Sequence, residues 1–194
     1  MILNDRQIAE LACSQVLIEP FYGCQVREFT KHADSLNEKV ISFGLSSFGY
    51  DIRADYDWKV FANIYGGTVV DPKDFDERSF VSISDDHCII PGNSFALTSS
   101  IEKIKMSKNL LGLCIGKSTY ARCGIIVNVT PIEPGWEGYI TIEVSNTTPL
   151  PVKVYSGEGI AQLLFFEGSL PSTSYAARAG KYMNQPKQVI LPKL

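Results

Sequence analysis

Residues 116–146 read GKSTYARCGIIVNVTPIEPGWEGYITIEVSN, and this stretch decides the expected fold. Two short apolar segments flank a turn marked by Pro and Gly, and the second segment, 138–145, alternates as a β-strand does. A carboxylate in the middle of such a strand, Glu143, either lies on a solvated sheet face or projects into a pocket. The alternation assigns Ile140, Ile142 and Val144 to one face and Tyr139, Thr141, Glu143 and Ser145 to the other.

The segment before it predicts a strand that leads into a short helical turn. Residues 110–116 form a nearly continuous apolar run, which is typical of a strand buried on both faces. Residues 117–122 suit a single turn of helix that opens with Ser and Thr and has a cation at each end. The unpaired backbone N–H groups of such a turn can bind phosphate. The spacing is not that of a P-loop, so a plain helical turn is the alternative.

Short β-runs separated by turn residues occupy most of the chain, which predicts an all-β sandwich or barrel. Asn4 is expected to cap a short helix over residues 5–13, and the polar residues 29–39 predict a surface loop. The turn at 156–159 predicts a hairpin between its two flanking strands. The remaining expected strands are 40–45, 56–61, 68–70, 88–90, 94–105, 152–155 and 160–166, with 189–191 as a short terminal strand.

Several other segments carry informative residues. Residues 46–53 combine Phe, Tyr and Arg around a central Gly, and indicate either a bulged strand edge or a segment at a subunit interface. The acidic residues 71–77 predict a loop. Gln162 shares a strand face with apolar residues, as a core or edge amide or as a ligand contact. Residues 168–194 have little to bury, so we expect a mobile tail that closes over a site when a ligand arrives.

The composition narrows the classes of function. A chain of 194 residues, 45% of them hydrophobic, supports a single domain with a sizeable core. The net charge of −3 argues against nucleic-acid or membrane-surface binding as the main role. No window is long and apolar enough to span a bilayer and the N-terminus is no signal peptide, so we expect a cytoplasmic protein.

Three motifs within residues 116–146 resemble the signature of the dCTP deaminases, which belong to the superfamily that also contains the dUTPases. They read GKSTYARCG, TPIEPGWEG and ITIEVSN. SSFGYDIR at 46–53, VDP at 70–72 and QLLFF at 162–166 are also similar to that family, so the likeness covers nearly the whole chain.

The resemblance implies a mostly β, distorted barrel or jelly-roll of the dUTPase-like type as one domain over residues 1–194, with the tail from about 168 as a lid. It implies a homotrimer with its sites at subunit interfaces. It also implies hydrolysis of dCTP to dUTP and ammonia, which supplies dUMP and thymidylate synthesis, and inhibition by dTTP.

The cysteines and histidines do not match a zinc site. The five cysteines are irregularly spaced without any C-x-x-C, which favours free thiols in a reducing compartment. The zinc nucleobase deaminases need His-x-Glu and Pro-Cys-x-x-Cys motifs, and the chain contains neither. Deamination by this protein is therefore expected to need no zinc.

Hydrolytic deamination at C4 of cytosine needs an activated water, protonation at N3 and support for the tetrahedral centre. Without zinc, a buried carboxylate must take the proton from water and pass it on. The resemblance places the family's catalytic Glu at Glu143, which makes it the expected general base and acid. Arg122 orients that carboxylate or stabilises charge near the amino group. Ser118 positions the water or a phosphate, since no His is placed to activate it as a nucleophile.

The resemblance also implies a set of substrate contacts. A triphosphate carries Mg²⁺ mainly through its own oxygens and water, so Mg²⁺ is expected to arrive with the substrate and no protein cage is required. Trp136 is expected either to pack against the deoxyribose or to be a structural aromatic. The implied substrate contacts are Lys117, Ser118, Thr119, Tyr120, Ala121, Arg122, Thr141, Ile142, Glu143, Gln162, Tyr175, Lys181 and Gln185.

Two departures from the family pattern leave alternatives open. Residues 130–135 form a shorter segment than in some members, and Glu133 stands where the dUTPases keep an Asp. A bifunctional enzyme that also releases pyrophosphate to give dUMP is one alternative. A non-catalytic dNTP-binding sensor is the other; it would keep Lys117 and Gln162 but would not need Glu143.

Overall fold

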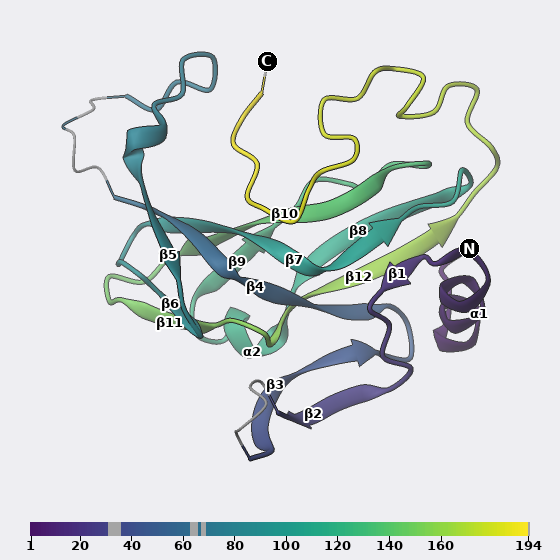
Figure 1. Ribbon diagram of the computed structural model, residues 1–194, viewed down its shortest axis with the longest axis horizontal. Coiled ribbons are helices and arrows are strands. Elements are labelled where there is room, and N and C mark those ends of the chain that lie inside the picture. Colours follow the sequence, from purple (N-terminus) through teal and green to yellow (C-terminus); the bar gives the residue numbers. More distant parts are fainter. Residues whose placement is uncertain (31–35, 63–65, 67–68, 194) are drawn as a thin grey trace.

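A computed structural model describes residues 1–30, 36–62, 66 and 69–193 (Figure 1). The structure is mostly β with one short N-terminal helix, so the predicted fold class is confirmed. The helical elements are α1 (Asp5–Gln15), a 3-10 helix (Glu77–Ser79) and α2 (Ser118–Ala121). The strands are β1 (Ile18–Glu19), β2 (Gln25–Phe29), β3 (Glu38–Leu45), β4 (Tyr50–Phe61), β5 (Phe80–Ser84), β6 (His87–Ile90), β7 (Phe95–Lys105), β8 (Leu110–Gly116), β9 (Ile125–Asn128), β10 (Glu137–Asn146), β11 (Val152–Tyr155) and β12 (Gly159–Glu167).

Helix α1 begins where the sequence predicts. The Asn4 side chain accepts a hydrogen bond from the Gln7 amide, and the Gln7 side chain accepts one from the Asn4 amide. This capping box satisfies two N–H groups that the first turn leaves open. The helix runs to Gln15, slightly past its expected end, and buries Ile8 and Ala12.

One large curled sheet organises the molecule. Its strands follow the order β2-β3-β4-β7-β10-β9, while β12 pairs with both β4 and β8 (Figure 1). β5 pairs with β4, β1 pairs with β7, and β6 and β11 form a separate two-stranded sheet. Neighbouring strands in these pairs run antiparallel. β10 is therefore an inner strand, held by β7 on one edge and β9 on the other.

β10 shows the alternation that the sequence predicts. Ile140, Ile142 and Val144 have exposed fractions of 3%, 0% and 0%, and they join the core with residues such as Trp58 and Phe165. Each such side chain contributes roughly 1.5–3 kcal/mol relative to leaving it exposed. The other face of β10 is half-buried and remains available for a site.

The predicted hairpin around residues 156–159 is wrong. β11 pairs with β6, whereas β12 pairs with β4 and β8. The turn is bound to the core instead: the Ser156 hydroxyl accepts from the Trp58 indole and donates to the Asp85 carbonyl, and the Gly157 amide donates to Ala54. These contacts direct the chain from one sheet into the other, which local turn residues do not reveal.

Five further expected segments differ from the structure or are described only in part. Residues 50–53 begin β4, so only 46–49 form a bend at its start. β8 is not buried on both faces, because Leu111 and Ile115 are exposed. Val69, Val70 and residues 189–191 form no strand; Thr68 lies outside the described residues. The expected loop at 29–39 has its ends in β2 and β3, and its centre, 31–35, is also outside the described residues.

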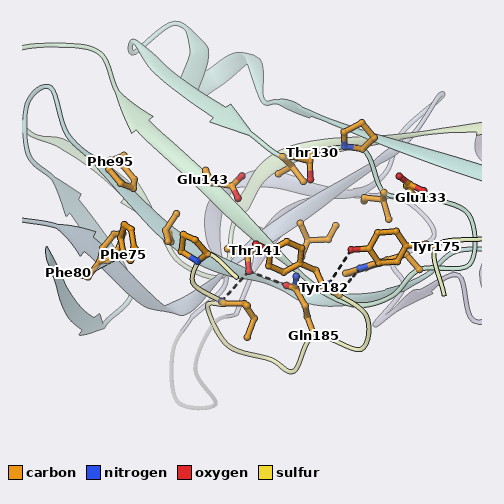
Figure 2. A pocket seen from close by; sticks show the side chains of 18 residues that line it. Phe75, Phe80, Phe95, Thr130, Glu133, Thr141, Glu143, Tyr175, Tyr182 and Gln185 are labelled. Atoms are coloured by element: carbon orange, nitrogen blue, oxygen red, sulfur yellow. Dashed lines mark hydrogen bonds between the residues drawn. The ribbon is translucent and has the colours of Figure 1, made fainter. Parts of the chain in front are cut away.

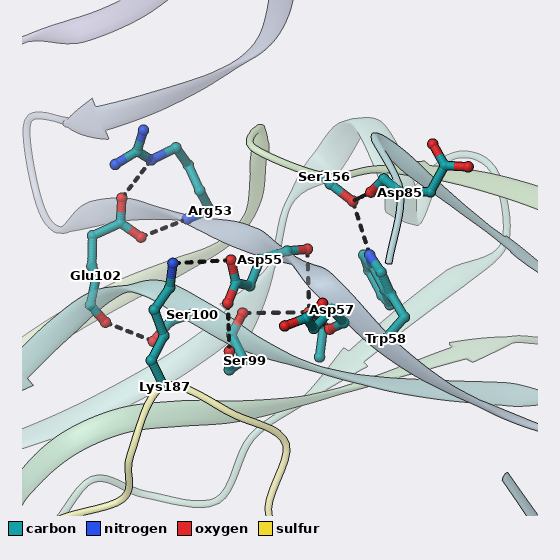
Figure 3. Close-up of polar contacts among 11 residues, drawn as sticks. Arg53, Asp55, Asp57, Trp58, Asp85, Ser99, Ser100, Glu102, Ser156 and Lys187 are labelled. Atoms are coloured by element: carbon teal, nitrogen blue, oxygen red, sulfur yellow. Dashed lines mark hydrogen bonds and ion pairs between the residues drawn. The ribbon is translucent and has the colours of Figure 1, made fainter. Parts of the chain in front are cut away.

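A buried ion pair joins β4 to β7. The Arg53 Nε donates to Glu102 Oε1 at 2.7 Å, and the Arg53 amide donates to Glu102 Oε2 at 2.9 Å (Figure 3). The two side chains are 5% and 0% exposed. The guanidinium also lies 4.5 Å from the centroid of Phe43 and 4.9 Å from that of Tyr22. Removal of one partner therefore leaves an uncompensated charge inside the protein.

Replacement of Glu102 by Ala is expected to lower the free energy of unfolding by about 3–5 kcal/mol, because Arg53 keeps its charge in a buried place. Urea denaturation at a fixed protein concentration measures the change. Arg6→Ala is the matched control, since the Arg6–Glu10 pair is 81% and 70% exposed and should matter little. A Glu102→Ala variant as stable as Arg6→Ala would contradict a stabilising role for the buried pair.

Candidate active site

A cavity of about 520 Å³ lies against the half-buried face of β10. Figure 2 shows three groups of side chains around it: Thr141 and Glu143 from β10, Thr130 and Glu133 from the preceding loop, and residues of the C-terminal segment. An aromatic group closes another side. The cavity therefore combines strand, loop and tail around one carboxylate.

Glu143 projects into this cavity rather than onto a solvated face. On the neighbouring strands it stands opposite Leu97 of β7 and Asn128 of β9. Its Oε2 atom is buried and has no hydrogen-bond partner among the described residues. Burial raises the pKa of Glu143 to about 7, although a hydrogen bond from its own backbone opposes the shift. A carboxyl group with this pKa can both take and return a proton near neutral pH.

The Cys114 thiol of β8 interacts electrostatically with the Glu143 carboxylate. Burial raises the pKa of the Cys114 thiol to about 12, and the charge of Glu143 adds to the effect. The thiol therefore stays protonated at neutral pH and places no second negative charge beside Glu143.

The C-terminal segment lies on β10 at the cavity. The Thr141 hydroxyl donates to Gln185 Oε1 at 3.1 Å and accepts from the Ile190 amide at 3.3 Å. The Tyr139 amide donates to the Gln185 carbonyl at 3.1 Å. The Tyr175 hydroxyl accepts from the Tyr182 amide (Figure 2). Of the expected substrate contacts, the structure thus gathers Thr141, Glu143, Tyr175 and Gln185 around one cavity.

Gly138 lets the tail come this close. A Cβ atom at position 138 would lie 2.6 Å from the Gln185 amide nitrogen and 3.1 Å from its carbonyl oxygen, both backbone atoms. The φ angle of Gly138 is also +147°, which L-residues rarely adopt. Gly138 and Gln185 form a parallel bridge, so the tail extends the sheet edge at this point.

The expected contacts on α2 lie elsewhere within this chain. None of residues 117–122 lines the cavity around Glu143. Arg122 is exposed and its guanidinium donates to the Ser118 carbonyl, which is the contact of a helix end. Tyr120 is buried and its hydroxyl accepts from the Tyr155 amide; burial raises its pKa. Ser118, Thr119 and Ala121 are exposed.

Lys117 does not point freely into solvent. Its ammonium pairs with the buried Asp51 carboxylate, which also accepts from the Gln25 side chain. Burial raises the pKa of Asp51, and the contacts with Lys117 and Gln25 oppose that shift. The pair fixes the start of α2 against β4 in the described chain.

The other expected contacts also lie outside the cavity. Ile142 is 0% exposed and faces the core. Gln162 donates to the Ser46 hydroxyl and the Phe48 carbonyl, so it holds the bend before β4. The Lys181 ammonium donates to the Lys193 carbonyl at 3.5 Å. Trp136, by contrast, lines the cavity, and its indole N–H donates to the Tyr182 carbonyl.

Sequence reasoning missed the aromatic side of the cavity. Phe75, Phe80 and Phe95 line it, and Phe95 stacks on Phe61 with ring centroids 4.9 Å apart. Phe80 meets Phe95 edge to face at 5.6 Å. No sequence motif joins these residues. The register of β5 with β4 and of β4 with β7 brings Phe80 and Phe95 together, and Phe75, from the segment before β5, packs on Phe80 with ring centroids 5.6 Å apart.

Within the described residues, no group of three or more His, Cys, Asp and Glu side chains is arranged to hold a metal ion. In the same part of the chain, none of the helices has the length and apolar character needed to cross a membrane.

Comparisons with known proteins agree with the motifs. A family model described as dCTP deaminase-like matches residues 2–168. The dCTP deaminase of Leptothrix cholodnii is 57% identical over 193 residues, which is 99% of this chain and 98% of that protein. The dCTP deaminase of Chlamydia caviae is 56% identical over 185 residues, or 95% of each.

A solved structure shares the fold at much lower identity. The crystal structure of 2′-deoxycytidine 5′-triphosphate deaminase from Agrobacterium tumefaciens superposes with a TM-score of 0.59 at 16% identity. The match covers 86% of this chain and 48% of that chain. The family match, the near-full-length relatives and the shared fold lead to one conclusion: the chain belongs to the dCTP deaminase-like family.

Proposed function

We propose that this protein hydrolyses dCTP to dUTP and ammonia, with Glu143 as the general base and acid. The observation that carries the proposal is the buried Glu143 carboxylate, which has one oxygen without a partner and a pKa raised to about 7. Relatives named dCTP deaminase, 54–57% identical over nearly the full chain, supply the reaction.

In this mechanism the Glu143 carboxylate removes a proton from a water that attacks C4 of the cytosine ring. Glu143 passes this proton to N3, which gives a tetrahedral centre with a hydroxyl and an amino group on C4. Glu143 then takes the proton of that hydroxyl and delivers it to the amino group, so that the C4=O bond forms as the C4–N bond breaks and ammonia leaves. A positioned carboxyl group of this kind typically accelerates such a step by about 10²–10⁴-fold. Leu97 and the neighbouring aromatic rings keep bulk water away and so maintain the high pKa.

The site is proposed to be completed by a second copy of the chain in a homotrimer. Ser118 and Arg122 are exposed on α2 and do not line the cavity of their own chain. Apolar side chains are exposed nearby in sequence, with Ile115 at 46% and Ile126 at 57%. A neighbouring copy packed against β8 and β9 would cover them and could bring its α2 to Glu143.

Mg²⁺ is proposed to accompany the substrate. It would be bound by the triphosphate oxygens and water, and would neutralise phosphate charge. Arg122, exposed at the end of α2, is proposed to supply positive charge for the same phosphates, whereas the Lys117 ammonium is paired with Asp51 within this chain.

Glu143→Gln is expected to lower kcat by at least about 100-fold while dCTP still binds, because the amide keeps the shape but cannot accept the proton. Glu133→Gln is the matched control: Glu133 lines the same cavity, but it pairs with Arg178 at the surface. Ammonia release and dCTP titration measure the two effects. If Glu133→Gln is inactive and Glu143→Gln is active, the wrong carboxylate has been assigned.

The pH profile of kcat/KM is expected to fall about tenfold per unit on the acid side of about pH 7, because only the ionised form of Glu143 is a base. An ordinary Glu would place this limb near about pH 4.3. Measurement of initial rates between about pH 5 and 9 decides between the two. A profile that is flat down to pH 5 would show that the buried carboxyl does not control turnover.

A zinc-selective chelator is expected to leave ammonia release unchanged when Mg²⁺ is in excess, because the chain lacks the zinc-ligand motifs of the zinc deaminases. Product analysis in the same assay distinguishes dUTP from dUMP with pyrophosphate. Loss of activity that only added zinc restores would contradict the proposed chemistry, and pyrophosphate released in step with ammonia would establish the bifunctional reaction.

A further inference from the structure

An irregularity in β4 lies directly beneath the C-terminal segment. Ala54 pairs with Ser100 and Trp58 pairs with Thr98, so residues 55–57 of β4 stand opposite Ser99 alone. The Thr98 hydroxyl donates to the Asp57 carbonyl at 2.9 Å, which satisfies one backbone group freed by this bulge. Bulges redirect side chains, and they are frequent beside functional sites.

The bulge places Asp55 as a buried carboxylate on the sheet. Its side chain is 7% exposed and accepts from the Ser99 hydroxyl at 3.1 Å. Lys187 of the C-terminal segment lies across from it, with Nζ 3.2 Å from Asp55 Oδ1 (Figure 3). A buried carboxylate is strongly destabilising when its cation is removed, so this contact favours a tail that lies on the sheet.

Lys187 follows Gln185 by two residues, a span of at most about 7 Å. Gln185 contacts Thr141 of β10, and Thr141 stands opposite Ser99 of β7. Ser99 in turn contacts Asp55 of β4. The tail thus crosses three adjacent strands and is fixed on both sides of β7, by Gln185 on β10 and by Lys187 on β4.

We infer that Asp55 and Lys187 are a positioning pair that holds Gln185 over the candidate active site. Neither side chain lines the cavity, so both act through Gln185 and the tail backbone. The kinetic consequence rests on the proposed function, whereas the structural consequence does not. The pair fixes the register in which the tail lies on the sheet, in addition to the hydrogen bond between Gln185 and Thr141.

Hydrogen exchange of the Tyr139 amide tests the inference without any substrate. This amide donates to the Gln185 carbonyl, so its exchange reports whether the tail is seated. Lys187→Met should speed its exchange by about fivefold or more, and Lys187→Arg should retain most of the protection. Lys193→Met is the control, because it removes a charge from the same tail but Lys193 forms no carboxylate contact in the described structure. The Asn146 amide, which donates to the Ser94 carbonyl at the other end of β10, should not change.

Steady-state kinetics provide the second test. Lys187→Met and Asp55→Asn should each raise the KM for dCTP by about five- to tenfold with little change in kcat, and the double variant should be no worse than the more impaired single variant. A merely structural role would instead lower the melting temperature and leave the KM for dCTP unchanged. If Asp55→Asn does not fold, the comparison of Lys187→Met with Lys187→Arg still tests the positioning role of the pair.

The two proposals fail in different ways. Unchanged Tyr139 exchange in Lys187→Met, or an equal change in Lys193→Met, overturns the positioning pair whatever the enzyme does. If the wild-type protein releases no ammonia from dCTP, the proposed function is wrong, while the exchange experiment still tests the pair.

Discussion

The pairing of β10 with β7 is the constraint on which the rest of the structure depends. Because side chains on a strand alternate between faces, one strand supplies both the centre of the core and the floor of the cavity. Ile142 and Val144 are fully buried on one face of β10, while Thr141 and Glu143, which alternate with them along the strand, face the cavity. A shift of this register by one residue would exchange the two faces, so the position of Glu143 is as firmly specified as the core itself.

The environment of Glu143 carries a cost in stability. Its pKa is about 7 in the folded chain and lies near the ordinary Glu value of about 4.3 in an unfolded chain. Between these two values the folded state binds more protons than the unfolded state, so stability falls as the pH rises through this window and then stays reduced. At neutral pH the protein therefore retains an ionised or half-ionised group that its own burial disfavours. Such a cost is common where a carboxyl group is adjusted to transfer protons.

Local sequence rules identified the elements that local forces determine. The Asn4 cap, the alternation of β10 and the single turn of α2 all depend on residues close together in the chain. The pairing of β11 with β6, which replaced the expected hairpin, depends on contacts of Ser156 with Trp58 and Asp85, and no turn rule contains such partners.

The site was predictable only in part for the same reason. Strand alternation placed Glu143 and Thr141 on one face, and the family resemblance added Tyr175 and Gln185. Phe80 and Phe95 reach the cavity through the register of separate strands, and Phe75 reaches it by packing on Phe80, so no sequence motif identifies this group. The exposed residues of α2 show the opposite limit. The motif predicts substrate contacts there, but these residues do not line the cavity of their own chain.

At Gly138, contact with the tail is separate from packing in the core. The atoms nearest to a Cβ at position 138 would belong to the backbone of Gln185, so a side chain there would contact the tail before it contacted the core. Changes at this position should therefore alter how the tail lies on β10 while leaving the core intact. In a related chain with a side chain at position 138, the backbone around position 185 would have to follow a different path. This contact is therefore a place where the path of the tail can change while the sheet stays the same.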